Sequence, residues 1–160
     1  MSLRGLGEEE TAVVTEVYEP LRRFAGVVGP LEVDPDDLVQ EAFLRVLRHG
    51  ALSGLENPGA YLRRVVVNLA ADHRRRLGRR RRALARLAAS SPSGVDPVFP
   101  SDVADLLHLE PRARAVLFMH DVEGYSYQEI ANLLGLSDSA ARMVASRARR
   151  RLRAAFAEEV

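Results

Sequence analysis

The stretch "SYQEIANLLGLSDSAARMVASRARRRLRAAF", residues 126–156, predicts two helices separated by a very short turn. Ser126 and Glu129 satisfy the S-x-x-E pattern of a capping box, so a helix is expected to begin directly after Ser126. Gly135 can adopt the left-handed conformation that ends a helix and turns the chain. Ser137 then caps a second and much longer helix.

Helices joined by so short a turn cross steeply, which requires a small residue at the crossing and apolar residues on the inner faces. Ala131 is the small residue, four positions before Gly135. The apolar positions are Ile130, Leu134, Leu136 and Val144. The pattern therefore predicts a helix-turn-helix unit, whose second helix would lie in the major groove of DNA.

One stripe of this second helix carries side chains that can meet base edges and phosphates. Its members are Arg142, Met143, Ser146, Arg147 and Arg150. The alternative interpretation is an ordinary helical hairpin with a basic, solvated face. Because the cap, the glycine and the arginine stripe agree independently, we favour DNA binding.

The bulk composition limits the class of protein. With 160 residues the chain can form one ordinary domain or two small ones, and it contains no Cys for disulfides or thiolate metal sites. The N-terminus lacks the apolar core of a signal peptide, and no stretch approaches the roughly 18 apolar residues that span a bilayer. These features predict a soluble cytoplasmic protein.

The net charge of +1 conceals a strong segregation of charge along the chain. Residues 61–86 contain ten Arg and one acidic residue, and residues 131–160 contain six Arg and three acidic residues. By contrast, residues 1–60 contain five Arg and eleven acidic residues. Two basic blocks on an otherwise acidic chain suggest two surfaces that face polyanions. Every basic residue is Arg, which also fits a GC-rich genome, so we rely on arginine positions rather than on the bias.

The N-terminal half is expected to be helical, because apolar residues recur at three- and four-residue steps. A first helix covers about residues 13–25, with Pro20 as a candidate kink. A second helix begins after Asp34 as N-cap, with Pro35 in its first position, and ends before Gly50.

A third helix is expected from Ala60 to about Arg82. Its inward-facing residues would be Tyr61, Leu62, Val65, Val66, Leu69 and Ala70. Arg64, Asn68, Asp72 and Arg75 fall three or four positions apart on another face.

The segment "AASSPSGVDPVFP", residues 88–100, is rich in Ser, Pro and Gly and is interpreted as a flexible linker. The chain would then be all-α, with two small helical domains at residues 1–87 and 101–160. In the second domain, Ser101 can cap a short helix and Pro111 can begin another that ends near Gly124.

Taken in order, these motifs resemble a bacterial RNA polymerase sigma factor of the extracytoplasmic-function (ECF) type. "DPDDLVQEAFLRVLR" resembles that family's region-two helix, which docks on the coiled coil of the polymerase β′ subunit, and "AYLRRVVVNLAADHRRR" resembles its helix for melting and reading the −10 element. "LEPRARAVLFMHDVEGYSYQEIANLLGLS" with "RARRRLR" resembles its region four, which reads the −35 element. The likeness covers roughly residues 11–157.

The resemblance implies partners and site residues that the side-chain chemistry permits. The implied partners are the RNA polymerase core, through its β′ coiled coil and β flap, and promoter DNA; an anti-sigma factor is a further candidate. Asp37, Gln40 and Glu41 would form an acidic and amide surface for the core, with Phe43 in the protein interior. The residues implied to face the −10 DNA are Arg64, Asn68, Arg75 and Arg76, an amide for an unstacked base and guanidinium groups for phosphates.

Several positions depart from the family pattern. Tyr61 stands where the family commonly has Trp, and the arginine run through Arg82 is denser than the fold requires. Met143 cannot donate a hydrogen bond to a base, so an unusual or weaker −35 preference is expected. Because the sequence stops at Val160, we expect none of the additional C-terminal domain that some relatives carry.

Three other classes of function compete with this interpretation. A helix-turn-helix regulator that acts without polymerase is the main alternative. An enzyme is disfavoured because no Gly-rich phosphate loop, nucleophile elbow or triad pattern occurs, and we expect no catalytic residue and no cofactor. The four histidines have no metal-ligand spacing, so no metal site is expected. A membrane-surface helix is disfavoured because Arg79 to Arg82 surround the whole helix.

Overall fold

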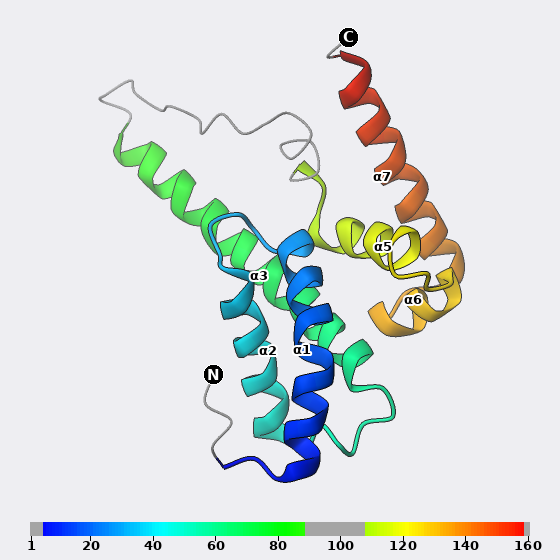
Figure 1. The fold of residues 1–160 in the computed structure, drawn as a ribbon. Coiled ribbons are helices and arrows are strands. Elements are labelled where there is room, and N and C mark those ends of the chain that lie inside the picture. The colour runs from blue at the N-terminus through cyan, green and yellow to red at the C-terminus, as the bar shows by residue number, and fades with distance from the viewer. Residues whose placement is uncertain (1–4, 89–107, 159–160) are drawn as a thin grey trace.

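The computed structural model describes residues 5–88 and 108–158, and within these ranges every regular element is a helix. Figure 1 shows their arrangement: α1 (Glu8–Val28), α2 (Pro35–His49), α3 (Pro58–Leu87), α5 (Pro111–Asp121), α6 (Tyr127–Leu134) and α7 (Asp138–Glu158). The predicted all-α class is confirmed. Apart from residue 88, the expected linker lies outside the described residues, as does the short helix expected from Ser101.

The first three helices pack on one another as a bundle. The Asp34 side chain caps α2 by accepting a hydrogen bond from the Asp36 amide at 2.8 Å, as predicted. Asn57 caps α3 in the same way, accepting from the Ala60 amide at 2.9 Å. The first helix is longer than expected at both ends and continues through Pro20. The third helix runs five residues beyond its predicted end at Arg82.

The expectation that Tyr61 points inward is wrong. Its side chain is 45% exposed, whereas Leu62 is fully buried. Successive helix residues lie about 100° apart, and the face of α3 that packs on α1 and α2 is centred on Leu62, Val66 and Leu69. Tyr61 therefore lies at the border of the apolar stripe, where hydrophobic periodicity alone does not separate core from surface.

The helices α5, α6 and α7 form a second bundle with the predicted helix-turn-helix. The capping box is complete: the Ser126 hydroxyl accepts from the Glu129 amide at 3.2 Å, and Glu129 accepts from the Ser126 amide at 2.7 Å. Gly135 has φ 65° and ψ 42°, the left-handed conformation that ends α6. The Ser137 hydroxyl then accepts from the Ala140 amide at 3.1 Å at the start of α7.

The two bundles pack against each other through α5, which contacts both α1 and α3 (Figure 1). Phe24 of α1 meets Phe118 of α5 edge to face, with ring centroids 6.1 Å apart. Between the bundles, Arg63 of α3 forms an ion pair with Glu123, which follows α5. A single cluster of buried apolar side chains therefore extends from α1 to α7.

Arg114 of α5 is buried against the C-terminal end of α1. Its Nη1 donates to the carbonyl oxygens of Val27 and Gly29, both at 3.1 Å, so it satisfies carbonyls that the end of a helix leaves without partners. Burial is the main cause that lowers the pKa of Arg114, to about 10, and nearby Arg74 adds to the effect. The side chain still carries its charge at neutral pH, where a cation at a helix C-terminus is favourable.

Within the first bundle, Glu10 ties the α2–α3 loop to α1. The Glu10 carboxylate accepts hydrogen bonds from the amides of Leu52 and Ser53 at 3.0 and 2.9 Å, and from the Ser53 hydroxyl at 2.6 Å. The bonds from Ser53 are the main cause that holds the pKa of Glu10 below its ordinary value. Glu10 thus fixes the loop that leads into the N-terminal turns of α3.

Among the helices in the described residues, none is long and apolar enough to cross a membrane.

Candidate nucleic-acid interface

The acidic and amide side chains expected to form a surface on α2 lie on the outside of the bundle formed by α1, α2 and α3. Asp37 is exposed, and Gln40 and Glu41 are half-buried one turn further along. The Glu41 carboxylate is held by Arg45 at 3.2 Å and by Nε2 of His73 at 3.2 Å. Asp37 and Gln40 are therefore more accessible to a partner than Glu41.

Leu44 extends this surface with an apolar side chain. It is 51% exposed and stands seven residues after Asp37, two turns along the same face of α2. A single exposed leucine is common on protein surfaces, so Leu44 adds apolar area to this face without by itself marking a binding site. Sequence reasoning did not name Leu44, although Leu44 follows the three polar residues by three, four and seven positions, a spacing that places all four on one helix face.

The residues expected to face the −10 DNA lie on α3, and all four are exposed. Arg64, Asn68 and Arg75 share one stripe, because their spacings of four and seven residues bring them to similar angles around the helix. Arg76 is displaced from Arg75 by about 100° and lies toward the α2 side. Arg75 also forms an ion pair with Asp72, one turn earlier. The structure thus brings three of the four together.

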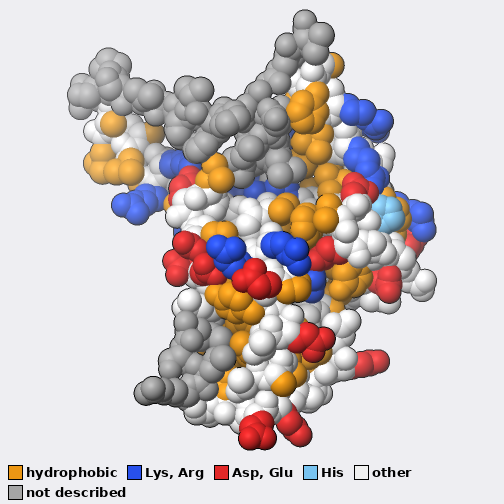
Figure 2. Space-filling model, viewed as in Figure 1, with side chains coloured by type: hydrophobic (Ala, Val, Ile, Leu, Met, Phe, Trp, Pro, Cys, Tyr) orange, Lys and Arg blue, Asp and Glu red, His pale blue; other side chains and the backbone are white. Residues whose placement is uncertain are grey.

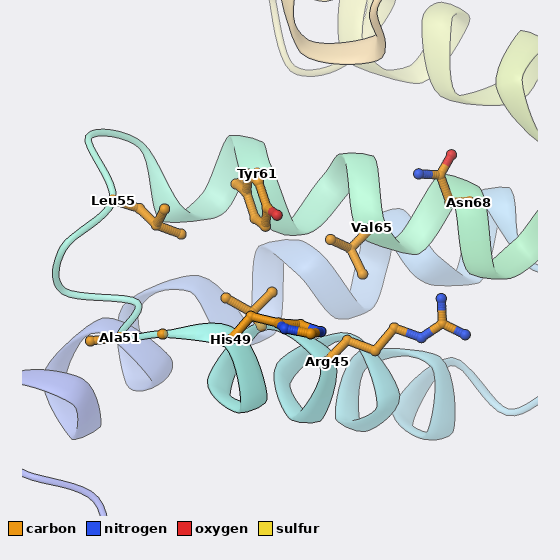
Figure 3. Close-up of a pocket in the computed structure, with 9 residues that line it drawn as sticks. Arg45, His49, Ala51, Leu55, Tyr61, Val65 and Asn68 are labelled. Atoms are coloured by element: carbon orange, nitrogen blue, oxygen red, sulfur yellow. The ribbon is translucent and has the colours of Figure 1, made fainter.

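A pocket of about 310 Å³ lies beside this stripe, between α3 and the end of α2. Figure 3 shows Tyr61 and Val65 directed from α3 toward α2, with Arg45 and His49 on the opposite wall and Asn68 at one end. An aromatic ring, apolar groups and an amide are the groups that stack on and hydrogen-bond an unstacked base. Sequence reasoning singled out Asn68 as a residue facing the −10 DNA and named neither Arg45 nor His49, whose approach to α3 depends on how α2 packs on it.

In the second bundle, the side chains of the predicted readout stripe on α7 are all exposed: Arg142, Met143, Ser146, Arg147 and Arg150. Nε of Arg142 donates to Oδ2 of Asp138 at 2.7 Å, and this hydrogen bond is the main cause that raises the pKa of Arg142. Ala141, Ala145 and Ala148 lie on the opposite side and are buried. The small buried residues let α7 sit close to α5 and α6 while the longer polar side chains point outward.

Basic side chains gather over α7 and over the projecting end of α3, as Figure 2 shows in blue. The residues at the end of α3 are exposed from Arg79 onward, in a segment that extends beyond the packed helices (Figure 1). Arg81 pairs with Glu32, which precedes α2. Exposed leucines, Leu84 and Leu87, follow the arginines on this segment.

The chain matches two family models in the order expected of a sigma factor. Residues 13–80 match Sigma-70 region 2, and residues 106–152 match Sigma-70, region 4. It is 33% identical to the RNA polymerase sigma factor CarQ of Myxococcus xanthus over 77% of this chain and 75% of CarQ. The chain belongs to the ECF RNA polymerase sigma factors.

Relatives whose names include ECF are similar over a smaller part of their own length. The probable ECF sigma factor SigI of Mycobacterium tuberculosis is 33% identical over 81% of this chain and 48% of SigI. SigE of Mycolicibacterium smegmatis is 36% identical over 75% of this chain and 51% of SigE. The chain therefore spans about half the length of these two relatives.

A solved structure supports the fold of this ECF sigma factor. The sigma factor RpoE from Bartonella quintana, crystallised with the anti-sigma factor NepR, aligns with a TM-score of 0.62 over 94% of this chain and 98% of RpoE, at 19% sequence identity. The region 2 match includes α2 and most of α3, and the region 4 match includes α5, α6 and most of α7. Both candidate DNA-facing surfaces lie within matched regions.

Proposed function

We propose that this sigma factor binds the RNA polymerase core and directs promoter recognition and transcription initiation. The observation that carries the proposal is the presence of an acidic surface on α2 and of two separate basic, exposed helical faces on α3 and α7. In this proposal the chain is not itself a catalyst, and it acts where the chromosome is, in the cytoplasm.

The α2 surface of Asp37, Gln40, Glu41 and Leu44 is the proposed docking site for the β′ coiled coil of the core. The exposed Asp37 carboxylate and the half-buried Gln40 and Glu41 suit arginines on a partner helix, and Leu44 supplies apolar contact area at one end of the surface. The β flap of the core is the second proposed contact, made by the second bundle.

The face of α3 that contains Arg64, Asn68 and Arg75 is proposed to hold the opened −10 element, with Arg76 as a flanking phosphate contact. The neighbouring pocket, with Tyr61 on one wall, has the volume and the groups to accept an unstacked base. Guanidinium groups along the stripe would hold the phosphates of the same strand.

The exposed stripe of α7 is proposed to read the −35 element in the major groove. Arg142 and Arg147 have the donor geometry for base edges, and Arg150 is suited to phosphates. Ser146 can serve either role. Met143 can contact only apolar groups such as the thymine methyl, so one base of the element would be read by shape and contact rather than by hydrogen bonding.

The proposed division into functional units places the docking and −10 surfaces in residues 1–87 and the −35 surface in residues 101–160, joined by a linker at residues 88–100. An anti-sigma factor is a further proposed partner. Support for it comes from the RpoE structure, in which the related fold is crystallised with the anti-sigma factor NepR.

Run-off transcription with purified core polymerase tests the proposal directly. We expect promoter-dependent transcripts only when this chain is added. In the charge-reversed variant Asp37→Arg, core binding should be lost, because a cation replaces the carboxylate that faces the partner. Glu19→Arg, the same change at an exposed position on α1, is the matched control and should bind the core normally.

Two outcomes would contradict the proposal. The first is that the wild-type chain neither binds core polymerase nor supports a promoter-dependent transcript. The second is tight, sequence-specific DNA binding by the free chain without any effect of polymerase, which would favour a regulator that acts alone.

A further inference from the structure

Tyr127, the first residue of α6, contacts three side chains of the second bundle. Its ring stacks on the His120 imidazole, with 4.0 Å between ring centroids and 22° between the planes. The guanidinium carbon of Arg142 lies 4.9 Å from the centre of the Tyr127 ring. The Tyr127 hydroxyl accepts a hydrogen bond from Nη1 of Arg149 at 3.0 Å. One aromatic side chain therefore contacts two arginines of α7.

Arg142 and Arg149 lie on the same side of α7, because seven residues correspond to about two helical turns. Ser146, four residues after Arg142, lies between them on that side. Arg142 and Ser146 belong to the proposed readout stripe, whereas Arg149 is half-buried. Tyr127 consequently borders the stripe along the edge where α7 meets α6.

Arg142 is restrained by contacts that leave its outer edge available. Its Nε donates to Asp138, and its guanidinium carbon lies over the Tyr127 ring. Within residues 5–88 and 108–158 no hydrogen bond engages its Nη1 or Nη2, and the side chain is 62% exposed. A guanidinium held over an aromatic ring keeps its in-plane donors for two acceptors on one base edge, as guanine presents in the major groove.

The Tyr127 ring is itself fixed by α5. Nδ1 of His120 donates to the Tyr125 carbonyl at 2.8 Å, which holds the imidazole on which Tyr127 stacks. On the other side, Nη2 of Arg149 donates to Asp121, the last residue of α5, at 2.5 Å. The position of Tyr127 is thus determined by the helices that support α7 and not by α7 alone.

We propose that Tyr127 is a positioning residue for base readout by Arg142. Its ring orients the guanidinium of Arg142 before DNA binds, and its hydroxyl fixes the turn of α7 that contains Arg149. A side chain that is already restrained loses less conformational entropy when it contacts a base. This inference rests on the proposed function of α7 as the reader of the −35 element.

Two full-length variants separate the ring from the hydroxyl: Tyr127→Leu removes both, and Tyr127→Phe removes only the hydroxyl. Each is assayed by run-off transcription with core polymerase on promoters in which every −35 base pair is substituted in turn. We expect Tyr127→Leu to reduce discrimination at one G·C pair by about fivefold or more, the lower end of what a bidentate contact contributes. Tyr127→Phe should keep that discrimination and lower transcription equally from all promoters.

A double-mutant cycle with Arg142→Ala shows whether Tyr127 acts through Arg142. In the Arg142→Ala background, Tyr127→Leu should cause no further change in discrimination. Tyr127→Met, which fills similar space without an aromatic face, should behave as Tyr127→Leu does. Thermal unfolding of each variant, followed by circular dichroism, verifies that the variants are folded at the assay temperature.

The inference is overturned if Tyr127→Leu or Tyr127→Met keeps wild-type discrimination. It is also overturned if Tyr127→Leu causes the same loss of discrimination in the Arg142→Ala background as in the wild-type chain. A wild-type chain that gives no promoter-dependent transcript would overturn both this inference and the proposed function. If discrimination stays at the wild-type level after the ring is removed, only the role of Tyr127 is contradicted, and the proposed function of α7 is not.

Discussion

Arg63 on α3 and Glu123 beyond α5 form an ion pair that is buried between the two bundles. Nη2 and Nε of Arg63 donate to the two carboxylate oxygens at 2.6 and 2.9 Å, and the side chains are only 8% and 15% exposed. The rings of Phe24 and Tyr125 lie 5.7 and 5.8 Å from the guanidinium carbon. Water has little access to this contact, so neither charge can be solvated if its partner is removed.

We therefore expect Glu123→Gln to lower the free energy of unfolding by about 3–5 kcal/mol, because Arg63 would be left as a buried charge without its counter-ion. Urea denaturation measures the change. Arg45→Gln breaks the exposed pair with Glu41 and should cost less than about 1 kcal/mol. Equal effects of the two substitutions would show that the buried pair contributes no more than a surface pair.

Two glycine substitutions should have opposite effects on stability. Gly135→Ala forces a side chain into a left-handed conformation and should destabilise by about 1–2 kcal/mol. Gly78→Ala lies inside α3 and should stabilise by about 0.4–1 kcal/mol, since Ala is the better helix former. Neither new Cβ would meet an atom within 4 Å, so backbone conformation alone decides the sign. Urea denaturation that gives the same sign for both would refute this reasoning.

Removal of the outward-facing arginines of α7 should relax promoter selectivity. Arg142→Ala and Arg147→Ala are each expected to cost about 1–3 kcal/mol if they contact base edges, with the loss confined to particular −35 base pairs. Arg151→Ala, at an exposed position further along α7, should weaken transcription about equally from all promoters. Transcription from promoters with substituted −35 elements distinguishes the two patterns. Selectivity that survives both readout changes would mean that the stripe is wrongly assigned.

The acid sensitivity of the first bundle should depend on Asp36. Its carboxylate accepts from the Tyr18 hydroxyl at 2.7 Å and from Nε of Arg22 at 3.0 Å, and these bonds, the first above all, hold its pKa below the ordinary value of 3.8. A carboxyl group with a lowered pKa in the folded state stabilises above pH 3.8, and that contribution is lost as the pH falls through the lowered pKa.

Asp36→Asn should therefore reduce stability near neutral pH and flatten the fall in the thermal midpoint below about pH 4. Differential scanning calorimetry between pH 2 and 7 measures both effects. Asp37→Asn, at the neighbouring exposed position, provides the comparison. An unchanged slope in Asp36→Asn would show that the hydrogen bonds to Tyr18 and Arg22 do not contribute to the acid transition.

The features that sequence reasoning predicted correctly depend on near neighbours in the chain. The cap at Asp34, the capping box of Ser126 and Glu129, and the left-handed Gly135 each require only three or four consecutive residues. Their geometry follows from side-chain length and backbone sterics, so it can be predicted before any tertiary contact is known. The exposure of the α7 stripe follows in the same way from helical periodicity.

The features that sequence reasoning missed depend on partners far along the chain. Arg63 lies 60 residues from Glu123, and Arg114 lies 87 residues from the carbonyl of Val27, so neither is distinguishable from a surface arginine by spacing. The error at Tyr61 has the same origin, because the border between core and pocket is set by where α2 packs on α3. The role inferred for Tyr127 requires α5, α6 and α7 to be placed together.

The carboxylate of Glu10 also bears on how this protein can be divided into fragments. The match to region 2 begins at residue 13, so a fragment cut at that boundary would lack Glu10 and its three hydrogen bonds to Leu52 and Ser53. The α2–α3 loop would lose its attachment to α1, and the wall of the pocket beside Tyr61 would lose its support. A useful N-terminal boundary therefore lies before Glu8, where α1 begins, and not where the family resemblance begins.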